Sequence, residues 1–181
     1  MRLRHEGVGL WTADLAFPSW RRFRYRPPGW RGGGGAADDG DVVRVVVRSP
    51  PGDAEPSSPG AAALARLRWF LDHEAAVSDA ARGAVVAAWP GLLDTHGEPD
   101  DHPLPVVASA TDLESLLRLR AVVVHAVERD GVPYLGFEMD CVLDDEHGLG
   151  VMMQGARPVE LGGADTAILG WIAERDARAR R

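Results

Sequence analysis

The chain has 181 residues, a net charge of −7 and a pI of about 5.3, and 45% of its residues are hydrophobic. This length fits a single domain over residues 1–181 that can bury its own core. The acidity argues against nucleic acid as a partner, because phosphate backbones are held by basic surfaces. No apolar run is long enough to span a membrane, which argues against a membrane partner as well.

Cysteine usage and the N-terminal residues indicate the compartment. Cys141 is the only cysteine, so no intrachain disulfide can form, and this favours a reducing environment. The first residues lack the unbroken apolar core of a signal peptide. We therefore expect a cytoplasmic bacterial protein.

Arginine is distributed unevenly along the chain. All 20 basic residues are arginine, and residues 1–31 contain seven of them against two acids. This bias has two interpretations, the codon usage of a GC-rich genome or an arginine-rich binding face. Trp20 and Trp30 flank the arginine run, and aromatic residues with arginine are typical of protein-recognition surfaces.

In chain order, the first predicted strand covers residues 7–17, where apolar side chains occupy both faces. The second covers residues 42–48, a run of valines interrupted by arginine. Glycine and proline dominate the segments near 27–41 and 49–59, so we expect flexible loops there.

Helices are predicted in the middle of the chain. Apolar residues spaced three or four apart begin a helix at about Ala61. Asp72 and Glu74 resemble a second helix start, and Pro90 resembles a stop. We therefore expect two helices packed as a pair over residues 61–88, in preference to one long helix. A capping box at residues 111–114 predicts a further short helix over residues 113–118.

The last third of the chain predicts two hairpins and a terminal helix. Asp130-Gly131 is a strong hairpin signal between two apolar strands, and Gly155-Ala156 is a second turn. A helix is expected from about Ala164 to Arg175. The predicted fold is α+β, an antiparallel sheet with helices packed on one face, ending in a meander of two hairpins and a helix.

The first turn sets a register that gathers titratable side chains on one face. Counting back from the turn places His125 opposite Gly136, and diagonal to Glu138. Tyr134 and Asp140 share that mixed face, while the opposite face is apolar and must be core. The mixed face is therefore the best candidate for a site.

An acidic segment continues from this face. We expect Asp144, Asp145, Glu146 and His147 to form a loop between two strands, with glycines leading into the second strand. One interpretation is a metal site, because carboxylates and imidazole can bind a divalent ion. The other is a solvated turn in which Asp144 or Glu146 bonds the backbone before Gly148. The spacing matches neither an EF-hand nor the HExxH motif of metalloproteases.

Catalysis has one candidate pair. His125 beside Glu138 could serve in acid–base chemistry, and the alternative is a structural histidine on a half-exposed sheet. Cys141 alternates onto the apolar face and is expected to be buried. The sequence contains no phosphate-binding loop, dinucleotide-binding glycine pattern or nucleophile elbow. We therefore expect no cofactor and assign no catalytic residue.

The segment from Val132 to Ile168 resembles a family of uncharacterised bacterial domains, marked by the acidic "EHGLGV" stretch and a "GGAD" helix start. The stretches "GLWTADLAFPSW" and "LDHEAAVSDAA" are similar to the same family, so the resemblance covers most of the chain. Leu143 stands where many relatives have tryptophan. Some similar domains are regarded as immunity proteins, which implies a cytosolic protein that neutralises a cognate toxin by binding it.

Three functional hypotheses follow. The first is a non-enzymatic protein-binding factor of the immunity type, whose patch comprises His125, Tyr134, Glu138, Asp140, Asp144, Asp145, Glu146 and His147. The second is a small metal-dependent or acid–base hydrolase that uses the face of His125 and Glu138 together with the His147 loop. The third is a structural subunit with an apolar outer face at Val123, Val127 and Tyr134.

Overall fold

Seven strands form one sheet in the spatial order β1-β2-β3-β4-β5-β6-β7. The computed structural model describes residues 2–7, 9–26, 42–49, 58–96 and 106–179, so the expected loop at 27–41 and most of that at 49–59 lie outside the described residues. With η for a 3-10 helix, the elements are β1 (Arg4–Gly7), β2 (Leu10–Ala16), η1 (Pro18–Trp20), β3 (Val42–Arg48), α1 (Ala61–His96), η2 (Ala110–Leu113), β4 (Leu117–Arg129), β5 (Val132–Cys141), β6 (Asp144–Gln154), β7 (Arg157–Gly162), η3 (Ala164–Ala167) and α2 (Gly170–Ala179).

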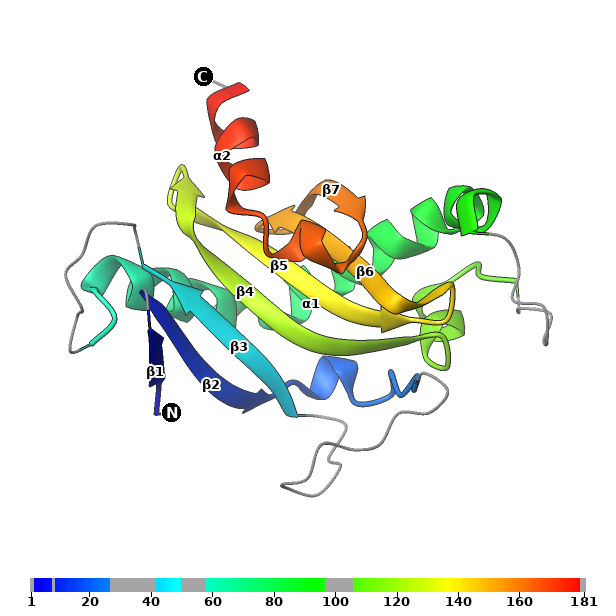
Figure 1. Cartoon of the computed structure of the whole chain (residues 1–181), viewed down its shortest axis with the longest axis horizontal. Helices are drawn as coiled ribbons and strands as arrows, with labels where there is room; N and C mark the ends of the chain where they lie inside the picture. Colours follow the sequence, from blue (N-terminus) through cyan, green and yellow to red (C-terminus); the bar gives the residue numbers. More distant parts are fainter. Residues whose placement is uncertain (1, 8, 27–41, 50–57, 97–105, 180–181) are drawn as a thin grey trace.

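The sheet is antiparallel except at one junction. β3 and β4 run parallel, and every other neighbouring pair is antiparallel. Parallel neighbours need a long crossover connection, and α1 lies within the segment that joins them. Figure 1 shows α1 crossing behind the sheet. The predicted α+β class is confirmed, as are the C-terminal meander and the helix after it.

The expected pair of helices is wrong, because α1 is one helix of 36 residues. Its buried side chains continue at helical spacing from Leu67 to Trp89, so a single stripe packs on the sheet throughout. Glu74 is no helix start, since its carboxylate accepts hydrogen bonds from Ser19 and Ser78 within the fold. Pro90 lies inside the helix, which continues to His96.

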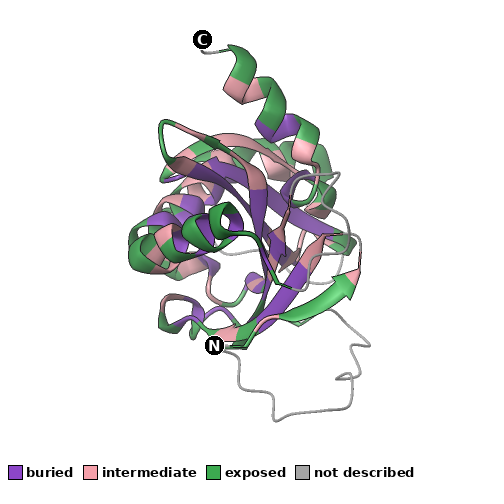
Figure 2. Ribbon diagram, turned by 90° about the vertical axis from the view of Figure 1, so that its left-hand side faces the viewer, coloured by how far each residue is buried: buried purple, intermediate pink, exposed green. Residues whose placement is uncertain are grey.

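The main core lies between α1 and one face of the sheet. It contains alternate residues of the central strands, such as Val45, Val122 and Phe137, each 0% exposed. Figure 2 shows buried residues along the strands and on the helix packed beside them. Trp20, one of the two tryptophans that flank the arginine run, is also core: it is 1% exposed and its Nε1–H donates to Ser78.

The opposite face of the sheet carries the C-terminal elements. η3 and α2 lie in front of the sheet in Figure 1, on the side away from α1. They replace the continuous helix expected from residue 164. A second, smaller hydrophobic cluster joins Tyr134 and Met152 of the sheet to Ile172 and Ala173 of α2. Trp171 of α2 is 49% exposed and packs against Arg175.

The short helix expected over residues 113–118 is also wrong. A 3-10 turn, η2, occupies residues 110–113, and β4 begins at Leu117. Its cap is formed by Ser109 and Asp112, whose carboxylate accepts the backbone and hydroxyl bonds of Ser109. Leu117 and Leu119 then alternate into the core as strand residues. Among the described helices, none is long and apolar enough to cross a membrane.

Candidate functional site

The β4–β5 hairpin has the predicted turn but not the predicted register along its length. Arg129 pairs with Val132 as expected. Between Val124 and Glu128 the register shifts, leaving residues 125–127 opposite Tyr134 alone. This shift is of two residues, so Val122 and Val124 keep the core face that was predicted for them. A second shift, of one residue, lies between Leu119 and Ala121. The expected pairing of His125 with Gly136 is wrong, because Val123 pairs with that glycine.

His125 is a buried residue with a backbone partner. It is 1% exposed, and its Nε2–H donates to the carbonyl of Ala167 in η3 at 2.9 Å. Burial lowers the pKa of the imidazole to about 4, so the ring is neutral at pH 7. Glu138 pairs with Ala121, four residues back along β4 from His125, which separates the two by about 13 Å along the strand. The structure does not bring them together as an acid–base pair.

Tyr134 is also interior. It is 0% exposed, and its hydroxyl donates to Asp176 of α2 at 2.6 Å. Burial raises the pKa of the phenol to about 12. Val123 is buried too, at 1% exposure, and Val127 packs against the cluster beneath α2. The apolar outer face that a structural subunit would use is therefore covered by η3 and α2.

Glu138 and Asp140 lie at the other end of β5 and share one cation. Arg120 of β4 approaches Glu138 at 3.2 Å and Asp140 at 3.4 Å. Burial raises the pKa of Asp140, although Arg120 and Arg118 oppose that shift. The N-terminal arginine segment runs beside the start of β4, where Arg22 pairs with Glu114 at 2.9 Å. Arg120, which sequence reasoning missed, thus forms ion pairs with both acids.

The expected acidic loop is instead the start of a strand. A two-residue turn joins β5 to β6, with Cys141 paired to Asp144. The next pair is Met139 with Leu149, so residues 145–148 bulge opposite a single residue of β5. Gly148 makes this possible: its φ is +69°, and a Cβ there would lie 2.4 Å from the carbonyl oxygen of Met139.

Asp144, the residue just before the bulge, organises the backbone of the bulge. Its carboxylate accepts the backbone N–H of His147 at 2.9 Å and lies 3.1 Å from the ring Nδ1. Partial burial alone would raise the pKa of Asp144, but these hydrogen bonds hold it below its usual value. The turn is therefore closed by an acid that bonds the backbone before Gly148, as the solvated alternative predicted.

The remaining charged residues of the bulge face solvent. Asp145, Glu146 and His147 are exposed, and Asp145 also accepts a hydrogen bond from the hydroxyl of Tyr25. Across the described parts of the chain, no group of three or more histidine, cysteine or acidic side chains is arranged to hold a metal ion. What the bulge presents is a small, acidic, solvent-facing edge.

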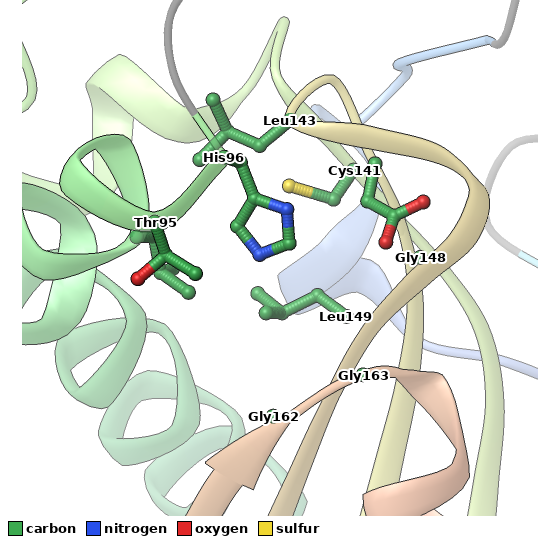
Figure 3. Close-up of a pocket in the computed structure, with 10 residues that line it drawn as sticks. Thr95, His96, Cys141, Leu143, Gly148, Leu149, Gly162 and Gly163 are labelled. Atoms are coloured by element: carbon green, nitrogen blue, oxygen red, sulfur yellow. The ribbon is translucent and has the colours of Figure 1, made fainter.

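A pocket that the sequence analysis missed opens beside this edge. It has a volume of about 180 Å³ and is lined by Leu92, Thr95, His96, Cys141, Leu143, Asp144, Gly148, Leu149, Gly162 and Gly163. Figure 3 shows Thr95 and His96 on one side, the β5–β6 turn on the other, and Gly162 and Gly163 below. The walls come from three distant segments. One of them is the last turn of α1, beyond the proline that was predicted to end the helix.

Cys141 forms part of this pocket as a neutral group. The predicted burial is confirmed, since the residue is 1% exposed. Burial raises the pKa of the thiol to about 11, so it is protonated at pH 7 and is a poor nucleophile. A larger hollow of about 580 Å³ follows one face of α1 from Ala61 to Asp72, but within the described residues its lining is this one helix. The pocket at Cys141 is the better enclosed site, and we call it the β5–β6 pocket.

Comparison with known proteins gives one match. A family model described as "Domain of unknown function (DUF6985)" matches residues 21–169, which include β3 to β7, α1 and every lining residue of the β5–β6 pocket. The match ends before α2 begins. No curated protein and no solved structure matches the chain.

Proposed function

The chain belongs to the DUF6985 family, and we propose that it works without catalysis, by binding a protein partner at the edge formed by the β5–β6 bulge. One observation carries the proposal: Asp144 lines a small apolar pocket, and the two acids that follow it in the sequence are exposed. Asp145 and Glu146 are exposed beside a cavity whose walls include Leu92, Leu143 and Leu149. An apolar centre with a polar, charged rim is the usual anatomy of a protein-binding surface.

Charge supports a basic partner. The whole chain carries −7, so a cationic protein is attracted from a distance. Near the edge, the charge of Arg120 offsets the charges of Glu138 and Asp140. The side chains of Asp145 and Glu146, in contrast, are exposed to solvent. The exposed pair is therefore the part of the predicted patch that a partner meets first.

The narrower form of the proposal is an immunity factor in the cytoplasm. The resemblance of the "EHGLGV" stretch to domains regarded as immunity proteins implies this form, and Gly148 and Leu149 of that stretch line the pocket. An immunity factor acts by covering a functional surface of its toxin, and an acidic edge suits a toxin whose surface is basic.

The geometry does not favour the hydrolase alternative. That alternative required His125 beside Glu138, and the observed register places them at different points of the strand. The imidazole of His125 is enclosed under η3, so a substrate could reach it only if that element moved. Tyr134, which shares the predicted mixed face, donates a hydrogen bond to Asp176.

Charge reversal at the exposed edge tests the proposal. The variant Asp145→Arg/Glu146→Arg is compared with Asp79→Arg/Glu174→Arg, which makes the same change in net charge on α1 and α2. Each protein is used as affinity bait in an extract of the native host, and the partner enriched by the unmodified chain is purified for binding measurements. We expect the edge variant to bind that partner at least tenfold more weakly, mainly through slower association, and the control variant to bind normally.

Equal loss of binding in both variants would show that general charge, and not this edge, holds the partner. Retention of full affinity by the edge variant would overturn the proposed surface. The immunity form has its own test, in which a toxin encoded beside this gene is expressed alone or together with the chain. Growth arrest that the unmodified chain relieves, and the edge variant does not, is the expected result.

A further inference from the structure

The β5–β6 pocket has the size of one side chain. Its volume of about 180 Å³ is below the range of roughly 300–1,000 Å³ typical of small-molecule and cofactor sites. Hot spots of protein interfaces, in contrast, are often single anchor side chains that enter a pocket of the partner. The cavity therefore suits an anchor residue better than a free metabolite.

The lining of the pocket favours an apolar anchor side chain. Most of the lining surface is carbon, contributed by Leu92, Leu143 and Leu149 together with glycine backbone. Leu149 is 4% exposed, so it forms a fixed wall and is not a loop side chain. Cys141 adds an uncharged thiol to the same lining, as Figure 3 shows. A leucine-sized aliphatic side chain matches this mostly apolar surface, and the polar side chains of Thr95, His96 and Asp144 complete the lining.

The charges beside the pocket determine which residues can flank the anchor side chain in the partner. Asp144 lines the cavity, and its side chain is 23% exposed while His147 holds it in place. Asp145 and Glu146 follow it into solvent. Three consecutive acids beside the opening would repel acidic neighbours of the anchor and attract basic ones.

We infer that the β5–β6 pocket is the docking point for a partner segment that presents one leucine-sized aliphatic side chain between basic residues. This inference rests on the proposed function, because it names the kind of segment that the partner brings to the same edge. The aliphatic side chain fills the cavity, and the flanking cations meet Asp144, Asp145 and Glu146.

Short peptides test the inference without the partner. The probes are acetyl-Gly-Arg-Leu-Arg-Gly-amide, the same peptide with serine in place of leucine, and the same peptide with glutamate in place of both arginines. Binding is followed by NMR through the methyl resonances of Leu92, Leu143 and Leu149. We expect saturable shifts with the first peptide at millimolar concentration, and binding at least fivefold weaker with each of the other two.

A filled pocket supplies the matched comparison. Thr95→Trp places a large side chain at a residue that lines the pocket, whereas Ala87→Trp adds the same side chain at an exposed position two turns earlier on α1. We expect only the Thr95 variant to abolish the shifts caused by the leucine peptide. Because the three peptides are also compared on the unmodified chain, a failure of one variant to fold would not leave the question open.

Each binding result tests a different part of the inference. Equal binding of the leucine and serine peptides overturns the anchor, and equal binding of the arginine and glutamate peptides overturns the basic flanks. If no peptide binds while Asp145→Arg/Glu146→Arg still loses the partner, the inference fails and the proposed function stands. If the leucine peptide binds selectively but that double variant keeps its partner, the pocket is confirmed and the proposed binding edge is wrong.

Discussion

His125 is the residue whose chemistry differs most from its appearance in the sequence. In the sequence it is a candidate acid–base group on the mixed face of the predicted hairpin. In the fold its imidazole lies under η3 and donates to the carbonyl of Ala167, and the charge of Arg48 adds to the effect of burial in opposing protonation. A histidine that is neutral and enclosed in this way makes the folded state sensitive to acid.

We predict that His125 causes a loss of stability as the pH falls from about 6.5 towards 4. Its pKa is about 4 in the folded state against 6.5 when unperturbed, so between these values the unfolded chain binds a proton that the folded chain does not. The free energy of unfolding should therefore fall by about 2 kcal/mol between pH 7.5 and pH 5 through this residue alone. Urea unfolding at a series of pH values measures the slope.

The comparison protein for this prediction is His125→Gln, which keeps a hydrogen-bond donor but does not titrate. We expect it to be less stable at pH 7.5, because packing is lost, yet to show a flatter decline in acid. His73→Gln, which removes an exposed imidazole from α1, controls for the loss of a histidine as such. Parallel pH profiles for the unmodified chain and His125→Gln would contradict the prediction.

At the scale of elements, η3 rests directly on the sheet because two glycines leave room for it. A Cβ at Gly136 would lie 1.8 Å from the carbonyl oxygen of Ala167, and one at Gly150 would lie 2.5 Å from that of Gly163. Backbone thus packs on backbone between β5, β6 and η3. The space above Gly136, where a side chain would otherwise stand, is filled by the backbone of η3.

We predict that Gly136→Ala will destabilise the fold by about 3 kcal/mol, because the new methyl group must push η3 off the sheet. Urea unfolding at pH 7.5 measures the loss, and faster hydrogen exchange at the amides of Thr166 and Ile168 would locate it in η3. Gly83→Ala is the matched control: it lies in α1 with nothing within 4 Å of the added Cβ. That substitution should stabilise the chain by about 0.5–1 kcal/mol through helix propensity. Similar effects of the two substitutions would refute the close packing of η3.

The elements also show where local sequence signals fail. Asp72 and Pro90 carry ordinary signals for a helix start and a helix stop, and α1 overrides both. Its buried stripe reaches Trp89 and keeps packing against the sheet, which outweighs the loss of one hydrogen bond at Pro90. Turn chemistry was more reliable, because Asp130 and Gly131 both adopt positive φ as a tight hairpin requires.

At the scale of the molecule, periodicity predicted which face of the β4–β5 hairpin packs in the main core, and the pairing of the last four strands followed from their turns. What it could not predict was contact between distant segments. The β5–β6 pocket needs the end of α1 beside Cys141 and Gly162, and the cover over Tyr134 needs α2 to fold back across the sheet. No local pattern encodes either contact. The acids of the site were found from composition, whereas their partner Arg120 became visible only through the register of β4 and β5.

The two faces of the sheet are covered unequally, which leads to a prediction for the whole chain. The cluster under α1 holds most of the buried apolar residues, whereas α2 adds a separate group around Tyr134, Met152 and Ile172. We predict that a chain ending at Leu169 still unfolds in one cooperative transition, since the main core is intact. It should lose about 3 kcal/mol, because Ile172 no longer covers the sheet and Tyr134 loses its bond to Asp176.

Urea unfolding and binding of a hydrophobic dye measure the two consequences of this truncation. The shortened chain should bind the dye at the uncovered face of β5 and β6, and a chain ending at Ala179 serves as the control because it retains all of α2. An unchanged unfolding midpoint would mean that α2 contributes nothing to stability. A broad, non-cooperative transition would mean that the smaller cluster is part of one indivisible core. In the expected case, α1 and the sheet form the stable body that carries the β5–β6 pocket, and α2 is an added cover on the opposite face.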